Sequence, residues 1–459
     1  MPLGTTNTRA VNTALTQGSI PAALYRMSWP MVVGLLATMS FNVADAFFVS
    51  GLGEHALIAL SFGFPIVMLA ISLFIGLGAG ASSAVAIAAG KGDENEVRAL
   101  VSDGLLLTAI ITIVLSVIAM LTITELFTLL GASAQVLPYI QDYMLIWYAG
   151  VLFFAVQMVG FSSMRALGNT ALQGKVMIGT ALLNVVLDPI LIYGWGVVPA
   201  LGIKGAAIAT LAMQVLSAAI VLYYMRVRMN LLINPFHKTR TFQSWKKILH
   251  VGVPAMATNM IIPVSGTLIV AIVAAHGEQA VAGIGVAGRI EAVMLVTFYA
   301  LSAVIGPFCG QNLGAGNFKR LYAVQKTCLV YCMGFGLFGA LILAASGAWL
   351  ASFFSDQADV IKAAQLYLLV VPISHMGHGV VMFVNASFNG LRKPMPGMAI
   401  STARVVVLLF PLIWLGQVWF DFTGIFVAIS VANLISGLYA YLWVRRTIRQ
   451  LELEHTCSV

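Results

Sequence analysis

Two acidic side chains lie deep within long apolar runs of this chain, and each has an amide side chain close by. Asp45 follows Asn42 by three positions and Asp188 follows Asn184 by four, so each pair shares one face of a helix. Pro189 has no backbone N–H, which leaves a carbonyl one turn earlier without its helical partner. These carboxylate, amide and carbonyl oxygens together suit a proton with its water, or a small hard cation.

Carboxyl groups in such surroundings are suited to couple an ion to a movement. Burial disfavours the charged form, and a second carboxylate nearby disfavours it further. Met39, Phe41 and Asn42 are candidates to line a substrate cavity beside Asp45, because flexible methionine-rich surfaces accept varied ligands. Pro30, upstream on the same run, is predicted to be either a hinge or the start of its helix.

Other ionisable side chains fall within later apolar runs. Arg289 and Glu291 are two positions apart and therefore do not share a helix face, so each is expected to pair with another helix. We expect a gating or structural role, with substrate or ion contact as the alternative. Arg404 is similar, and Glu291 is a possible partner for it. His375 and His378 are spaced for one helix face, and both a proton relay and simple packing are left open.

Composition places the chain in a bilayer. Of its 459 residues 60% are hydrophobic and 9% are charged, whereas soluble domains carry about 25% charged residues. The apolar runs far exceed the roughly 10-residue strands of a membrane barrel, so they predict helices. The four cysteines form no CxxC pair, and neither a disulfide nor a metal site is expected. No phosphate-binding P-loop is present, so we expect no ATP hydrolysis, no cofactor and no enzyme.

The apolar runs predict twelve membrane-spanning helices and therefore an all-α membrane protein. The expected domains are a cytoplasmic N-terminal tail (1–23), an N-lobe of six helices (24–228), a cytoplasmic linker (229–245), a C-lobe of six helices (246–446) and a cytoplasmic C-terminal tail (447–459). The predicted spans are 24–50, 56–86, 99–124, 139–164, 172–194, 203–227, 246–274, 280–308, 321–347, 362–389, 396–418 and 423–444.

The distribution of basic residues supports this topology. With these spans, 20 of the 24 lysines and arginines fall on one side of the membrane and two on the other. The positive-inside rule then predicts that both termini are cytoplasmic. The net charge of +8 is accounted for by topology, so no nucleic-acid partner is expected. A monomer in the lipid bilayer is the predicted state.

The two halves of the chain repeat. A shift of 224 residues places Pro30 on Pro254 and Gly53-Glu54 on Gly277-Glu278. An even number of spans per half makes the repeats parallel, which predicts two bundles with pseudo-twofold symmetry about the membrane normal. At this shift Asp45 meets an isoleucine, and at a shift of 222 residues Asp188 meets a phenylalanine. Because packing alone should repeat more evenly, the acids are predicted to be functional.

The chain resembles the multidrug and toxic compound extrusion (MATE) family, and its DinF-type branch in particular. The resemblance rests on twelve spans in two repeats, on Pro30 and Asp45 in the first span, and on the Leu183–Pro189 segment. It implies a V-shaped fold and a polar cluster of Asp45, Asn184, Asp188 and Thr210 that binds the coupling ion. The implied partners are protons and amphipathic organic cations or drugs, at the bacterial inner membrane.

The expected function is therefore a proton-coupled multidrug antiporter that works by alternating access. Sodium coupling stays open, because the same oxygens suit Na⁺. A lipid or lipid-linked-precursor flippase of the same superfamily is the main alternative, and a basic cavity around Arg289 and Arg404 would favour it. A channel or membrane scaffold is a third possibility, against which the repeat and the buried acids argue.

Overall fold

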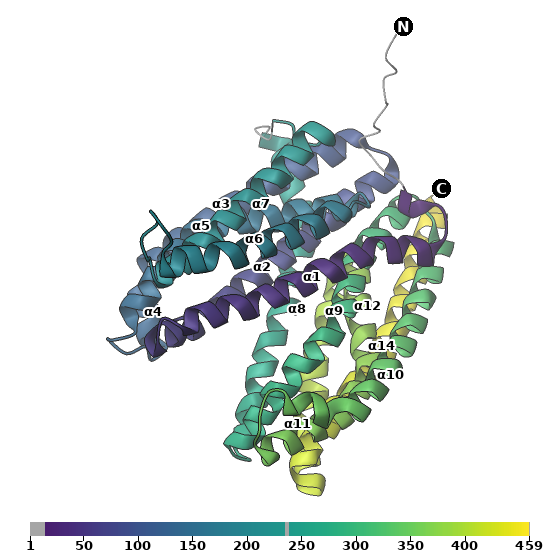
Figure 1. Ribbon diagram of the computed structural model, residues 1–459. Helices are drawn as coiled ribbons and strands as arrows, with labels where there is room; N and C mark the ends of the chain where they lie inside the picture. The colour runs from purple at the N-terminus through teal and green to yellow at the C-terminus, as the bar shows by residue number, and fades with distance from the viewer. Residues whose placement is uncertain (1–13, 235–237, 459) are drawn as a thin grey trace. The chain divides into compact units, whose positions relative to one another are not determined.

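The computed structural model describes residues 14–234 and 238–458, which fold into helices joined by short turns (Figure 1). In this described part a single isolated bridge, between Trp195 and Val198, is the only extended pairing. The helices of the first half are η1 (Ala14–Thr16), α1 (Ile20–Ser50), α2 (Glu54–Lys91), α3 (Glu94–Leu121), α4 (Ile123–Leu129), α5 (Leu137–Ala166), α6 (Ala171–Tyr193), α7 (Ile203–Tyr223) and η2 (Tyr224–Arg228). Those of the second half are α8 (Lys238–Ala274), α9 (Glu278–Gly314), α10 (Phe318–Ser352), α11 (Ala358–Val370), η3 (Pro372–Ser374), α12 (His375–Gly390), α13 (Pro394–Ala403), η4 (Arg404–Leu409) and α14 (Phe410–Ser458).

Eleven helical segments of the described chain are long and apolar enough to cross a bilayer, and the last of them contains two spans. It runs from Pro394 to Cys457 over 64 residues, which as one helix would far exceed the roughly 30 Å hydrocarbon layer. Asp421 breaks it with a backbone φ of 49° and ψ of −132°. The backbones of Gly416 and Gly424 meet across this break, so the chain folds back on itself. The predicted twelve spans are therefore confirmed.

The chain forms two compact units. Among the described residues, the first contains 29–234 and 238–252, and the second contains 14–28 together with 253–458. In the first unit α5 packs against α2, α3 and α7; in the second α12 packs against α9, α10 and α14. Helices α1 and α8 each pass from one unit to the other beside a proline, at Pro30 and Pro254 respectively. These are the two prolines that the sequence repeat aligns.

Helix α8 begins earlier than the sequence predicts. It starts at Lys238, inside the stretch expected to be a linker (229–245), because side chains of its first turns are held by α3. The fully buried carboxylate of Asp103 accepts hydrogen bonds from Arg240 (3.3 Å) and Thr241 (3.1 Å). The Trp245 indole donates to the Asp103 carbonyl at 2.8 Å.

Helices extend into both ranges that the sequence predicts as tails. Helix α14 continues to Ser458, through the range 447–459 that was predicted as a tail. At the other end, residues 1–13 of the predicted tail (1–23) lie outside the described residues, and α1 already begins at Ile20. The carbonyls of Leu15, Gln17 and Gly18 accept hydrogen bonds from Arg320, so this segment is anchored to α10 within the second unit.

Candidate functional site

Helices α1 and α6 run parallel in a register that brings Asp45 to the level of Asp188. At one end the Gly174 backbone lies against the Pro30 carbonyl, and Gly34 lies against Met177. At the other end the Tyr193 hydroxyl donates to the Phe48 carbonyl at 2.6 Å, between residues 145 positions apart. Both helices rise about 1.5 Å per residue, so the same offset holds between these ends. It places Asp45 beside the turn of α6 that contains Asp188 and Pro189.

The Asp188 carboxyl group is fully buried and is held by its own helix. Asn184, one turn earlier and 3% exposed, directs its carboxamide at both carboxylate oxygens. With the amide nitrogen toward Asp188, it donates to Oδ1 and Oδ2 at 2.8 Å each. This confirms that the two side chains share a helix face. Pro189 follows within the same helix, so α6 lacks one backbone hydrogen bond at this level.

A buried tyrosine lies within electrostatic range of the two acids. The carboxyl groups of Asp45 and Asp188 lie close enough for their charges to interact, and both act on the buried phenol of Tyr143. Oδ1 of Asp45 is buried and has no hydrogen-bond partner among the described residues. The site in the first unit therefore combines α1, α5 and α6 around two carboxyl groups, one of which has an open oxygen.

The other residues predicted for this site lie on α1 and α7. Asn42 is exposed, and Met39 and Phe41 are half-buried. Thr210 is half-buried on α7, which packs against α6, but its side chain makes no hydrogen bond within the described part of the chain. Pro30 lies ten residues inside α1, so it does not mark the start of that helix.

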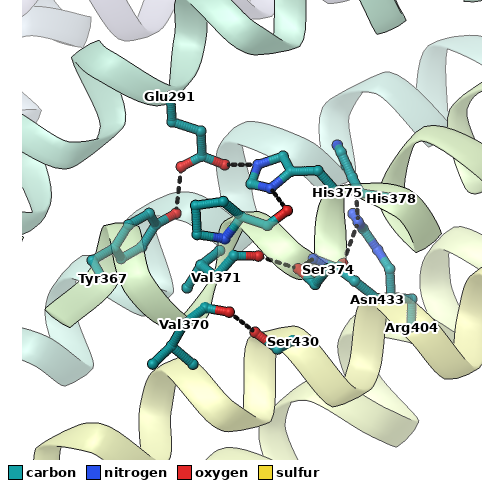
Figure 2. A network of polar contacts seen from close by, with 11 residues as sticks. Glu291, Tyr367, Val370, Val371, Ser374, His375, His378, Arg404, Ser430 and Asn433 are labelled. Carbon is teal, nitrogen blue, oxygen red and sulfur yellow. Dashed lines mark hydrogen bonds and ion pairs between the residues drawn. The ribbon is translucent and has the colours of Figure 1, made fainter. Parts of the chain in front are cut away.

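The second unit contains a separate ionisable cluster, shown in Figure 2. Glu291 on α9 contacts His375 through its Oε1, and the Tyr367 hydroxyl donates to its Oε2 at 2.6 Å. His375 is 2% exposed, and the Glu291 side chain is 13% exposed. The other ring nitrogen of His375, Nδ1, lies 2.9 Å from the Pro372 carbonyl. The three side chains come from three helices, α9, α11 and α12.

Arg404 forms the other side of this cluster. Its guanidinium donates to His378 Nδ1 at 2.8 Å and to Asn433 Oδ1 at 3.2 Å. Asn433 in turn donates to the Ser374 hydroxyl at 3.0 Å. Arg404 thus pairs with a histidine and an amide, not directly with Glu291. Arg289 is exposed and lies outside this network.

Irregular backbone positions the cluster. A 3₁₀ turn, Pro372–Ser374, interrupts the span between α11 and α12, and a π-helical turn begins at Arg404. Pro372 cannot donate a backbone hydrogen bond, which accounts for the first interruption. π-helical turns recur at functional sites in helical proteins. Both interruptions lie within spans that the hydropathy pattern predicts as continuous.

The sequence did not point to three residues of these two clusters. Asn433 is a polar residue within a predicted span, but no acid lies within a helical turn of it, so it lacked the signal that marked Asn184. Tyr143 and Tyr367 gave no such signal, because tyrosine is ordinary in membrane helices. Their roles depend on neighbours from distant helices.

Comparisons with known proteins agree with this architecture. The MatE family model matches twice, over residues 30–190 and 254–415, and the two matches begin 224 residues apart, as in the sequence repeat. The FAD transporter of Shewanella oneidensis is 35% identical over 94% of this chain and 96% of its own length. The multidrug export protein MepA of Staphylococcus haemolyticus is 22% identical over 95% and 96%.

A solved structure gives the same result in three dimensions. The crystal structure of the Vibrio cholerae MATE transporter VcmN in the bent form has a TM-score of 0.90 and 30% identity, covering 97% of this chain and 99% of that one. The paired family matches, the full-length relatives and the shared helical fold agree, and the chain belongs to the MatE family, the MATE membrane transporters, which are not enzymes.

Proposed function

We propose that this chain is an antiporter that exports amphipathic organic compounds across the bacterial inner membrane in exchange for protons bound at Asp45 and Asp188. The observation that carries the proposal is the register of α1 and α6, which brings two carboxyl groups to one level of one unit, within electrostatic range of each other. Both termini are proposed to be cytoplasmic, as the distribution of basic residues indicates.

Coupling follows from the cost of charge in a membrane. An ionised side chain at the bilayer centre costs about 2.5–3.5 kcal/mol on insertion scales, and two neighbouring carboxylates cost more because they repel. Proton binding removes this cost. It also turns Asp45, whose Oδ1 has no hydrogen-bond partner in the described part of the chain, into a hydrogen-bond donor. A new hydrogen bond from that group would pull on α1, and Pro30 is the proposed hinge for the resulting bend.

Sodium is the second candidate for the coupling ion. Na⁺ takes oxygen ligands, as other hard cations do, and the site offers carboxylate oxygens and the backbone carbonyl that Pro189 leaves without a helical donor. The same two acids would then be the ligands, so the ion must be identified by transport and not by mutation.

Two substrate classes are proposed on the names of the relatives. A flavin dinucleotide is favoured, because the FAD transporter is 35% identical over nearly the full length, whereas the multidrug export protein is 22% identical. Amphipathic organic cations are the second class, and an acidic site suits their charge. A lipid flippase gains less support: Arg404 shares its cluster with Glu291, and Arg289 lies apart from it, so the region is not simply basic.

The test is transport by the purified protein in proteoliposomes. FAD and the cationic dye ethidium are offered under a pure pH gradient and then under a pure sodium gradient. We expect proton-driven flux of FAD, and its loss in Asp45→Asn and Asp188→Asn. The matched control is Asp359→Asn, an exposed acid paired with Lys362, which should transport normally. Unchanged flux in both site variants would remove these acids from the mechanism.

A further inference from the structure

The hydrogen-bond partners of His375 determine how many protons the Glu291–His375 pair holds. The Pro372 carbonyl can only accept, so Nδ1 of His375 must carry a proton. Nε2 faces Oε1 of Glu291 within hydrogen-bonding distance, and one proton must lie between them, because two lone pairs would repel. The pair therefore holds one proton more than a neutral imidazole beside a carboxylate.

The neighbouring histidine is in a different state. A guanidinium can only donate, so Nδ1 of His378 accepts from Arg404 and the ring is neutral, with its proton on Nε2. The two rings lie 6.5 Å apart on one helix, yet only His375 shares an extra proton with a carboxyl group. The two histidines, whose roles the sequence left open, therefore differ: His378 accepts a hydrogen bond from Arg404, and His375 shares a proton with Glu291.

We propose that Glu291 and His375 form a second proton-binding site, distinct from Asp45 and Asp188, which takes up and gives up one proton in each transport cycle. The presence of the bound proton follows from the geometry alone. Only its exchange during transport rests on the proposed function.

The backbone interruption between α11 and α12 connects this proton to conformation. Three successive carbonyls at the interruption each accept a hydrogen bond from a side chain: Val370 from Ser430, Val371 from Ser374, and Pro372 from His375. The Val371 and Pro372 carbonyls also accept from the backbone N–H groups of Ser374 and His375, which close the 3₁₀ turn. When the shared proton leaves, Nε2 and Oε1 both present lone pairs and repel. The His375 ring must then rotate, which breaks the hydrogen bond from its Nδ1 to the Pro372 carbonyl. The 3₁₀ turn between α11 and α12 loses one of its side-chain contacts.

The ionisable groups around the pair favour exchange over permanent retention. Tyr367 donates to Glu291, and the phenol of Tyr299 lies within reach of the charges of both Glu291 and Arg404. With the extra proton the pair is neutral, and Arg404 leaves the cluster with one positive charge. Loss of the proton makes the cluster neutral as a whole, which a membrane interior favours. Arg404 therefore offsets the cost of the negative charge left on the pair.

The bound proton is tested by nitrogen NMR on the full chain with labelled histidines, of which there are seven. His375→Asn assigns the signal. At about pH 8, where an exposed histidine has lost its second proton, we expect His375 to show a proton at Nδ1 and a second one bonded to or shared with Nε2. A neutral His375 ring whose Nε2 neither carries nor shares a proton would overturn the proposal. Where His375→Asn fails to fold, the absence of any ring with a second bound or shared proton among the seven histidines of the wild type would still overturn the proposal.

Exchange of the proton is tested by adding FAD to the purified protein in weak buffer with a pH-indicator dye. Glu291→Gln and His375→Asn should each lower the release by about one proton per chain, and the double variant should lower it no further, since the proton belongs to the pair. His250→Asn, an exposed histidine on α8, is the control and should release as the wild type does. Equal release by wild type and both single variants refutes the proposed exchange. No release from wild type with any substrate would instead refute the proposed substrate and coupling, while the NMR result stands by itself.

Discussion

Replacing Asn184 with leucine keeps the branched shape of the side chain and removes the amide that bonds the Asp188 carboxylate. With its nitrogen toward Asp188, the Asn184 amide donates to both carboxylate oxygens at 2.8 Å in a buried setting. A hydrogen bond to a charged group stabilises it by about 1.5–3 kcal/mol, and one pH unit corresponds to about 1.4 kcal/mol. Without the amide the carboxyl group keeps its proton more readily and releases it only at higher pH.

The pH profile of transport should therefore move upward by about 1–2 units in Asn184→Leu. Substrate flux is measured in proteoliposomes across a series of pH values, with the driving gradient kept constant. At the optimum of the wild type, the variant should be about 10-fold to 100-fold slower. The expected direction depends on the amide nitrogen facing Asp188.

The matched control is Asn259→Leu on α8, whose amide donates only to the Ala255 carbonyl of its own helix, at 2.8 Å. It should leave the pH profile in place. A profile of Asn184→Leu that superimposes on the wild type, in protein with unchanged thermal stability, would refute the reasoning. A shift to lower pH would show that the amide oxygen accepts from a protonated Asp188.

Three further predictions concern other parts of the molecule. Asp103→Ala should lower the free energy of unfolding by about 2 kcal/mol, because a buried acceptor of two side-chain hydrogen bonds is lost. The loss is no larger because Arg240 is partly exposed and is easily rehydrated. Thermal and denaturant melting measure it. Tyr143→Phe should keep the fold but reduce proton-driven flux several-fold, and normal flux would argue against its place beside the acids. Arg289→Gln should transport as the wild type does, because this side chain is exposed, and a large loss of flux would show a contact that the structure lacks.

Much of the fold could be predicted because its signals are local. Hydropathy over 20-residue windows gave the spans, and the alignment of Pro30 with Pro254 gave the repeat that the family model later matched twice. The signals failed where tertiary contacts shape the backbone. The early start of α8 depends on Asp103, which lies more than a hundred residues away. The 3₁₀ turn at Pro372 and the π turn at Arg404 leave hydropathy unchanged and so gave no signal.

The sequence by itself determined that Asn184 and Asp188 share a face, because helical periodicity fixes the neighbours of a residue within its own helix. Only the tertiary structure decided that Tyr143 lies within electrostatic range of both acids, that Glu291 contacts His375 and that Arg404 bonds to His378. Each of these contacts joins residues of different helices. Such contacts depend on the register in which the helices interdigitate, which is set by the packing of many side chains at once and not by any one segment.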